Sequence, residues 1–241
     1  MSLIKEEVTL KRTIKRMLKN IVYRLPSSSV LMLHKVTDDD PNSSFHVSKD
    51  NFYKLIDSFS DWATMDEVVL NKKKGKIVLS FDDVKDDLYL VAYPRLREKN
   101  IPFTIFITLD LLDKEGYITR KQLEELSKDP LVTIGGHCMI HEPLPEQSEN
   151  KQKYQFEKSH HILSEIAGKK VLYFAYPYGQ SNDISIKLLK EGTSYSYAFR
   201  VGGDVYNVVM SKNRFGLPRL QIGNKTIDKS IDKLKKYVCH K

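Results

Sequence analysis

The sequence predicts an α/β protein of parallel β-α units, of a size that suits one α/β barrel. Short apolar runs alternate with stretches of helical periodicity along the chain, which is typical of parallel strands joined by covering helices. The length of 241 residues falls within the range of about 200–250 that single α/β barrels often occupy. Because no interior linker is long enough to divide the chain, we expect one domain.

The first expected element is a basic amphipathic helix at residues 4–25. Its apolar positions recur at spacings of three and four, and Lys and Arg occupy the remaining positions until Pro26 ends the pattern. Such a helix either packs on the domain with a solvated basic face or lies on an anionic membrane surface. We therefore place an N-terminal helix at 1–26, the barrel at 27–224, and a basic C-terminal helix or tail at 225–241.

The first half of the barrel region begins with an apolar strand at residues 29–34. Ser48 is a good N-cap for a helix whose apolar residues are three and four positions apart. A Lys-rich turn ending in glycine then precedes the apolar strand 77–81. A helix is expected at 86–99, and it leads into a strand at 103–107.

The second half of this region repeats the alternation. Thr119 is expected to cap a helix that carries Leu123 and Leu126 on one face. The later strands are short apolar runs separated by more polar, helix-forming stretches. In chain order we expect a strand at 132–134, a helix at 150–166, a strand at 171–176, a helix at 184–189 and a strand at 197–199.

Composition and charge limit the possible function classes. Lys and Arg number 39 against 31 Asp and Glu, and the excess is concentrated in residues 5–24 and 225–241. No recognised nucleic-acid motif accompanies this charge, so we expect no nucleic-acid partner and consider peripheral contact with an anionic membrane instead. The two cysteines imply no disulfide framework. Since no cleavable leader is recognisable, we expect a cytoplasmic location, with the inner membrane face as one option.

Four of the predicted strands end in residues that can carry chemistry. In an α/β barrel, functional side chains gather at the C-terminal ends of the strands. The four endings are His34, then Asp82-Asp83, then Gly135-Gly136-His137, and finally Tyr176-Pro177-Tyr178-Gly179. Because several contain residue types that bind metals, we expect a metal site at this end of the barrel.

Two histidines and two carboxylates are the candidates for that site. His137 and His141 have the i, i+4 spacing that places two imidazoles together on one helical turn. Cys138 occupies the position that a zinc protease of the H-E-x-x-H type needs for its glutamate, so that class is excluded. Asp82 and Asp83 repel each other if buried together, unless a cation neutralises them. A structural histidine pair and an ordinary Asp-Asp turn remain the alternatives for these two patterns taken singly.

Taken in order, these motifs resemble the polysaccharide deacetylase family, also called carbohydrate esterase family 4 or the NodB homology domain. The resemblance rests on Ser80-Phe81-Asp82-Asp83, on His137-x-x-x-His141 and on Phe174-Ala175-Tyr176-Pro177-Tyr178-Gly179, and it extends over residues 30–222. It implies a distorted (β/α) barrel and a divalent metal, usually zinc, held by Asp83, His137 and His141. It also implies that Asp82 is the general base and that the backbone N–H of Tyr178 helps to form the oxyanion hole.

The resemblance implies hydrolysis of an N-acetyl group, less often an O-acetyl group, on an amino-sugar-containing saccharide or glycan precursor. The family usually carries a Leu-x-His motif late in the chain, but residues 217–222 contain no histidine. Leu31-Met32-Leu33-His34 resembles the branch that includes biofilm polysaccharide deacetylases, in which the barrel is circularly permuted and this motif comes first. On this basis His34 is the expected general acid.

Further differences from the family's usual pattern concern residues near Asp82, the expected general base. Ala175 stands where the family usually has an arginine, and we expect Arg219 to take over the pairing with Asp82 from a neighbouring strand. Tyr176 and Pro177, with Arg219, are expected to bind substrate or orient the base. Val84 replaces a usual glycine. These differences leave one alternative open, a catalytically impaired saccharide-binding member of the same fold.

Overall fold

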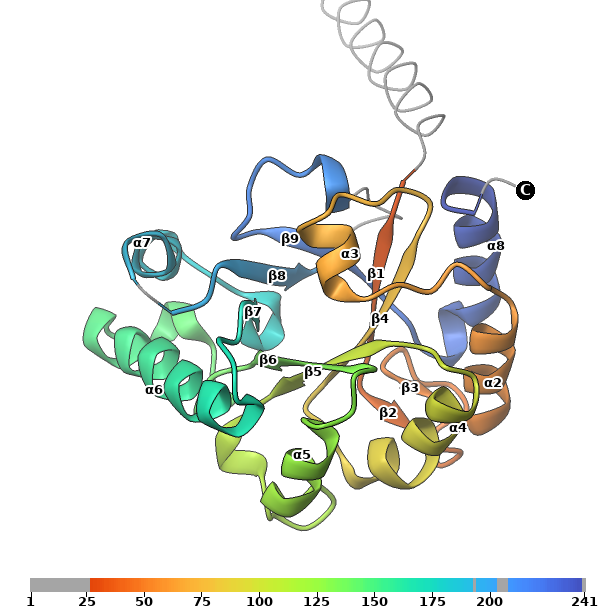
Figure 1. Ribbon diagram of the computed structural model, residues 1–241, viewed down its shortest axis with the longest axis horizontal. Coiled ribbons are helices and arrows are strands. Elements are labelled where there is room, and N and C mark those ends of the chain that lie inside the picture. Colours follow the sequence, from red (N-terminus) through yellow and green to blue (C-terminus); the bar gives the residue numbers. More distant parts are fainter. Residues whose placement is uncertain (1–26, 193, 203–207, 240–241) are drawn as a thin grey trace, which may run out of the picture.

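The computed structural model describes residues 27–192, 194–202 and 208–239, so the helix expected at residues 4–25 lies outside the described part. Its centre is a closed barrel of parallel strands in the order β1-β4-β5-β6-β7-β8-β9 (Figure 1). The strands are β1 (Ser29–Leu33), β4 (Ile77–Asp82), β5 (Phe103–Ile107), β6 (Val132–Gly136), β7 (Tyr173–Ala175), β8 (Tyr197–Val201) and β9 (Leu217–Gln221). The fold class predicted from the sequence is confirmed.

Helices surround the barrel (Figure 1). They are α2 (Lys49–Asp57), α3 (Met65–Val69), the π-helix η1 (Leu88–Ala92), α4 (Tyr93–Glu98), α5 (Arg120–Leu126), α6 (Glu149–Ala167), α7 (Asp183–Glu191) and α8 (Ile227–Tyr237). Five short 3-10 turns complete the set: η2 (Leu109–Leu111), η3 (Leu144–Glu146), η4 (Pro177–Gly179), η5 (Val208–Met210) and η6 (Asn224–Thr226). Among the residues described, no helix combines the length and the apolar character needed to cross a membrane.

The predicted helix starts agree with the structure. The Ser48 hydroxyl accepts a hydrogen bond from the Asn51 N–H at 3.3 Å, so Ser48 caps α2. Thr119 and Gln122 form a reciprocal capping box at the start of α5. The single helix expected at 86–99 is instead η1 followed by α4, with Pro94 in the first turn of α4. Proline lacks a backbone N–H, and here it lies at the point where the π-helical turn passes into the α-helix.

The sequence did not predict a small second sheet at the barrel mouth. β2 (Lys35–Val36) and β3 (His46–Val47) pair in parallel, directly after β1 and before α2. Strands of two residues show no periodicity that a sequence pattern can detect. This sheet holds the segment that follows His34 against the rest of the mouth.

The C-terminal segment is an integral part of the barrel fold. Residues 225–241 were expected to form a basic helix or tail beyond the barrel, and α8 makes up most of the part that the structure describes. Ile227, Ile231 and Leu234 of α8 are buried in the main hydrophobic core. The hydroxyl of Ser27 donates to the carbonyl of Tyr237, which ties the end of α8 to the residues that lead into β1. The basic residues of this segment therefore lie on a helix whose other face is buried.

The barrel closes between its first and last strands. β1 pairs with β4 along its whole length, and also with β9 through Leu31 opposite Leu220 and Met32 opposite Gln221. Closure leaves no strand of the barrel with an unpaired edge. It also brings residues from the two ends of the sequence, near positions 34 and 219, to the same side of the barrel mouth.

Candidate functional site

Three residues at the carboxyl ends of β4 and β6 form a cluster that can hold a metal. Ligand atoms of Asp83, His137 and His141 all lie within 4.8 Å of one another. His141 Nε2 is 3.5 Å from Asp83 Oδ2, and His137 Nε2 is 3.9 Å from Asp83 Oδ1. The structure thus brings together the three residues that the sequence assigned to the metal.

A left-handed backbone conformation separates the two neighbouring aspartates. Asp82 is the last residue of β4, and Asp83 directly after it has a φ of 48°. In a continuous strand two adjacent side chains would point to opposite faces. The turn at Asp83 instead directs its carboxylate to the histidines, while Asp82 reaches Arg219. A positive φ is uncommon for a residue other than glycine and is most often tolerated by Asp and Asn.

The backbone around His137 fixes the orientation of its imidazole. His137 Nδ1 lies 2.7 Å from the carbonyl oxygen of Ala175, an acceptor, so Nδ1 carries the proton and Nε2 offers a lone pair. The hydroxyl of Thr108 donates to the carbonyl of His137 at 3.0 Å. Cys138, the next residue, is fully buried with a φ of 74°. Burial raises the pKa of its thiol well above the usual value, so Cys138 is a packing residue and not a reactive one.

This donor set fits a divalent metal. Two imidazoles and one carboxylate are the ligands of many catalytic metal sites with open coordination positions. Two ligand atoms on one tetrahedral ion lie about 3.4 Å apart, which is close to the shorter separation observed here. The hydrogen bond from His137 to a backbone carbonyl is the usual support for a metal-binding imidazole. Burial and the neighbouring His137 lower the pKa of His141, which keeps its nitrogen available as a ligand.

Asp82 is buried in a bidentate ion pair with Arg219 of β9. Arg219 Nη1 is 2.6 Å from Asp82 Oδ1, and Nη2 is 2.6 Å from Oδ2. Both residues are almost completely buried, and Arg219 also lies over the Phe106 ring at 5.0 Å. Burial by itself would raise the pKa of Asp82, but the Arg219 guanidinium, together with His137 and His34, outweighs it and lowers this pKa to about 2. Asp82 is therefore ionised throughout the physiological pH range.

His34 follows β1 directly and lies at the same mouth. Burial lowers the pKa of His34, and the negative charges of Asp82 and Asp83 oppose that effect. Its ring meets the edge of Phe45 with a centroid separation of 5.7 Å. His34 Nδ1 is buried and has no hydrogen-bond partner within the described part of the chain. The structure thus places the expected acid within electrostatic reach of both aspartates.

Some residues of the motif Phe174–Gly179 lie at the barrel mouth, and others are buried in the core. Tyr178 has a φ of 56°, and its exposed ring packs against His141 with a centroid separation of 4.5 Å. Tyr176 was expected to bind substrate or orient the base, but its side chain is fully buried and its hydroxyl donates to the carbonyl of Phe215. Pro177 is also buried. A buried phenol cannot stack on a saccharide, so of the two expected roles only support of the site is open to the Tyr176 side chain, and Tyr176 and Pro177 lead into the turn that carries Tyr178.

Two residues of the site escaped the sequence analysis. Thr108 follows β5, and its hydroxyl lies 3.4 Å from Asp83 Oδ1 and bonds the backbone of His137. Its position directly after a predicted strand was the signal that could have identified it. Phe45 contacts His34 but lies in a polar loop, where no pattern distinguishes it. Val84, at the position of the usual glycine, is buried in the core.

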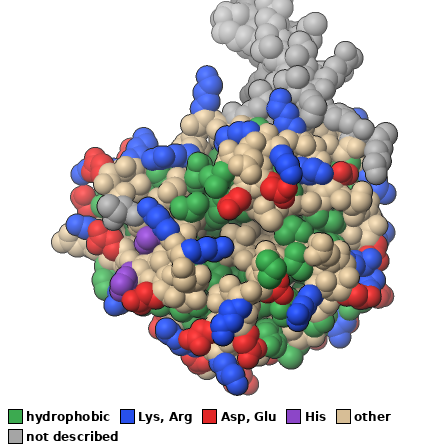
Figure 2. Space-filling model, viewed as in Figure 1, with side chains coloured by type: hydrophobic (Ala, Val, Ile, Leu, Met, Phe, Trp, Pro, Cys, Tyr) green, Lys and Arg blue, Asp and Glu red, His purple; other side chains and the backbone are tan. Residues whose placement is uncertain are grey.

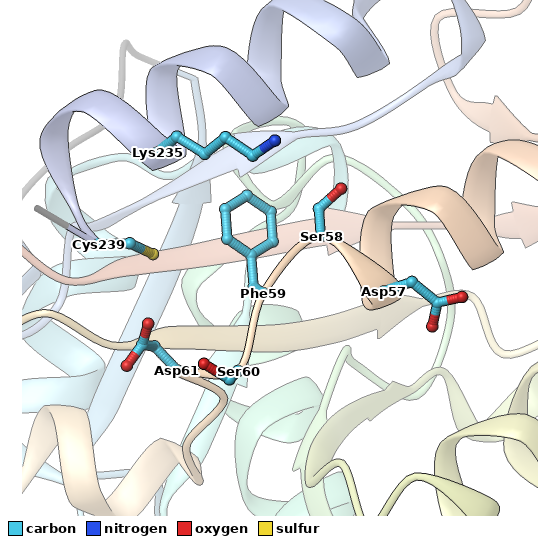
Figure 3. Close-up of a pocket in the computed structure, with 7 residues that line it drawn as sticks. All are labelled: Asp57, Ser58, Phe59, Ser60, Asp61, Lys235 and Cys239. Carbon is cyan, nitrogen blue, oxygen red and sulfur yellow. The ribbon is translucent and has the colours of Figure 1, made fainter. Parts of the chain in front are cut away.

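A hollow of about 430 Å³ lies at the opposite end of the barrel (Figure 3). It is lined by the residues that follow α2 and by Lys235 and Cys239 at the end of α8. Its carboxylates are already used, because Asp57 pairs with Lys99 and Asp61 with Lys76. The neighbouring Trp62 pairs with Ile77, the first residue of β4. This hollow is therefore remote from the cluster at the carboxyl ends of the strands.

Comparisons with known proteins agree with this geometry. The sequence model of the polysaccharide deacetylase family matches residues 70–195. Poly-beta-1,6-N-acetyl-D-glucosamine N-deacetylases of Staphylococcus epidermidis and Staphylococcus aureus are 25% and 26% identical, over 89% of this chain and 77% of theirs. Two similar solved structures are a Streptococcus pyogenes deacetylase in complex with acetate and IcaB from Ammonifex degensii. Both are 20% identical in sequence to this chain. The Streptococcus structure has a TM-score of 0.77 and the match covers 89% of this chain and 99% of that one; for the Ammonifex structure the values are 0.75, 88% and 98%.

Proposed function

The chain belongs to the polysaccharide deacetylase family and is a carbohydrate deacetylase, and from this premise we propose that it removes N-acetyl groups from a polymer of N-acetylglucosamine. The observation that carries the proposal is the pairing of Asp82 with Arg219 beside the cluster of Asp83, His137 and His141. The substrate class is supported by relatives named for deacetylation of poly-beta-1,6-N-acetyl-D-glucosamine.

The divalent metal is assigned to Asp83, His137 and His141, and zinc is the metal we favour. Two neutral imidazoles with one carboxylate form a common set of protein ligands for catalytic zinc. When bound, such an ion supplies Lewis acidity, which polarises a carbonyl oxygen and lowers the pKa of water. His137 is held for this role through its Nδ1 contact with Ala175, and Thr108 lies beside the Asp83 carboxylate.

Asp82 is the proposed general base. Its carboxylate accepts a proton from the water that attacks the acetamide carbonyl carbon, while the carbonyl π electrons move to oxygen. Arg219 holds both carboxylate oxygens, which fixes the direction from which this proton arrives. The lowered pKa of Asp82 favours release of this proton to bulk water after the reaction, which returns the carboxylate to its ionised form.

His34 and Tyr178 complete the reaction in this proposal. The Tyr178 N–H stabilises the negative charge on the former carbonyl oxygen, a type of contact worth about 3–4 kcal/mol per donor. His34 donates a proton to the amine nitrogen as the C–N bond breaks, so the products are acetate and a free amino sugar. Burial lowers the pKa of His34, which makes its protonated form a stronger acid.

Acetate release tests this function. The purified protein, loaded with zinc, is incubated with oligomers of β-1,6-linked N-acetylglucosamine and, separately, with chito-oligosaccharides. We expect acetate and free amines from the first substrate, and a loss of about 10²- to 10⁴-fold in kcat for Asp82→Asn. Metal binding without acetate release from any acetylated saccharide would sink the proposal and favour the saccharide-binding alternative.

We also propose that residues 4–25 hold the enzyme on an anionic membrane surface, at the cytoplasmic face. Their alternation of apolar and basic residues favours an interfacial helix, and the cytoplasmic leaflet is the anionic one. Over the face of the barrel seen in Figure 2, basic and acidic side chains are interspersed. The basic segment at residues 4–25 is thus the stronger candidate for lipid contact.

Liposome co-sedimentation tests this attachment. The full chain is expected to bind vesicles that contain phosphatidylglycerol and to remain free with phosphatidylcholine alone, because the attraction is electrostatic. Deleting residues 4–25 should abolish the binding while acetate release from soluble oligosaccharides continues. Equal partitioning of the two chains would contradict the proposal.

A further inference from the structure

Phe45 combines two properties that a packing residue does not combine. Its side chain is 53% exposed, although Phe is among the residues most often buried. It lies at the barrel mouth, where its ring contacts the imidazole of His34. A single exposed apolar side chain is ordinary on a protein surface; Phe45 is distinguished by its place beside His34, where a bound ligand would cover its ring.

The backbone of Phe45 is held firmly on both sides. The buried hydroxyl of Ser43 accepts from the N–H groups of Phe45 and His46 at 3.1 and 2.9 Å. The carbonyl of Ser43 accepts from the N–H of Lys225, and that of Ser44 from the side chain of Gln221 at 2.8 Å. These contacts tie the loop to the segment after β9.

Close packing restrains the same loop further. A Cβ atom on Gly223 would lie only 2.3 Å from the carbonyl carbon of Ser44, so the two backbones are in direct contact. On the other side of Phe45, His46 belongs to β3 and pairs with Lys35 of β2, the residue that follows His34. Phe45 and His34 are therefore fixed relative to each other. An aromatic ring that is both exposed and preorganised loses little entropy on binding.

We propose that Phe45 is the wall of a saccharide subsite and stacks against a sugar ring of the substrate while His34 faces the amine of the scissile bond. A pyranose ring carries axial C–H groups on its faces, and an aromatic face binds such a surface through dispersion and apolar burial. Tyr178 provides a second exposed ring beside His141, on another part of the mouth. The subsite rests on the proposed function and adds a specificity residue to it.

Kinetics on saccharides of different length test the subsite. We expect Phe45→Ala to raise KM for a tetrasaccharide about 5- to 30-fold and to change kcat less than threefold. Phe45→Trp should leave KM close to the wild-type value, because it keeps a flat aromatic ring. Phe45→Leu should raise KM, because it keeps an apolar side chain without an aromatic face. Tyr154→Ala serves as the matched control, since Tyr154 is equally exposed but lies on α6.

Two outcomes would overturn the subsite. An unchanged KM in Phe45→Ala removes it directly. A fall in kcat without a change in KM, rescued by Phe45→Leu, would mean that Phe45 only positions His34.

Calorimetric binding of the unhydrolysed tetrasaccharide to Asp82→Asn separates the subsite from the proposed deacetylase function. If the wild type releases no acetate but adding Phe45→Ala to Asp82→Asn weakens this binding, the deacetylase proposal fails and the subsite stands; if the wild type releases acetate and adding Phe45→Ala leaves the binding unchanged, the subsite fails and the deacetylase proposal stands.

Discussion

At the scale of single residues, the charge of Asp82 depends on Arg219. A carboxylate buried this deeply would ordinarily be neutral, because removing it from water penalises the ionised form. The guanidinium supplies two short hydrogen bonds and a compensating charge, so the ionised form persists. Arginine is better suited to this than lysine, since its planar fork matches both carboxylate oxygens.

Removing the guanidinium should therefore destabilise the fold. We expect Arg219→Met to lower the free energy of unfolding by about 3–5 kcal/mol, because it leaves an unpaired buried charge. The double variant Asp82→Asn with Arg219→Met, which removes both charges, should recover at least half of that loss. Urea denaturation followed by circular dichroism measures both quantities; equal stability of the single and double variants would contradict this account of the pair.

The sequence could identify the ligands but not all of their supports. Asp82, Asp83 and His137 end or follow strands as predicted, whereas His141 lies in the loop after β6 and not on the expected helical turn. Arg219 is 137 positions away from Asp82 and could be proposed only because Ala175 left the base without a partner. The burial of Tyr176 could not be predicted, since the motif does not reveal which of its side chains face the core. Its ring is buried against Phe174.

At the scale of elements, one carboxylate joins the small sheet to the helix after β4. Asp87 accepts the N–H of Val36 in β2, and its other oxygen is buried with no hydrogen-bond partner in the described chain. Burial raises the pKa of Asp87 to about 6, and the Val36 N–H only partly offsets this. The folded state thus binds a proton more readily at Asp87 than the unfolded state does.

This raised pKa makes a pH-dependent contribution to stability. The Asp87 carboxylate costs almost nothing below about pH 3, where both states are protonated; its cost grows as the pH rises toward the folded-state pKa of about 6 and levels off above it. Asp87→Asn keeps an acceptor for Val36 but no charge, so it should stabilise the protein by about 3 kcal/mol at pH 8 and about half as much at pH 5.

Chemical denaturation of wild type and variant at pH 5, 6, 7 and 8 measures this difference. Asp232→Asn on the exposed face of α8 is the control and should leave the stability nearly constant over that range. A gain for Asp87→Asn that does not change with pH would show that the carboxylate charge is not its source.

Long elements with clear caps were predictable, and short ones were not. β1, β4 and β5 were expected within a residue of their observed bounds, and Ser48 and Thr119 cap their helices as expected. α3 has five residues and β2 and β3 two each, too few for a period to show. β9 agrees with the expectation that Arg219 lies on a neighbouring strand, although it includes Pro218, a residue type that is uncommon inside a sheet.

At the scale of the whole molecule, a metal at Asp83, His137 and His141 should stabilise the folded chain, because the site forms only when β4 and β6 are in place. A ligand present at about 1,000 times its Kd adds about 4 kcal/mol. For a chain of this size that corresponds to a rise of about 10 °C in Tm.

Differential scanning calorimetry with zinc, and then with a chelator, tests this stabilisation. His141→Asn should remove most of the response, since it deletes one ligand. His161→Asn, an exposed histidine on α6, should retain all of it. If both variants respond like the wild type, the metal binds elsewhere.

The overall architecture was predictable as one parallel α/β barrel because the alternation of strands and helices extends through most of the chain. Charge alone could not show whether residues 225–241 form a tail apart from the barrel. α8 buries its apolar residues in the core and leaves most of its lysines on the opposite, exposed face. A basic helix can therefore be structural on one side and solvated on the other.

The pairing of β1 with β9 also has a consequence for synthesis on the ribosome. β1 and the histidine that follows it emerge before the other barrel strands, whereas β9 and Arg219 emerge after them, and Leu31 can meet Leu220 only after residue 220 has been translated. Contacts between such distant positions form slowly. A nascent chain that has released β4 thus carries the Asp82 carboxylate without its counter-ion, so we expect the active site to be completed only when the barrel closes.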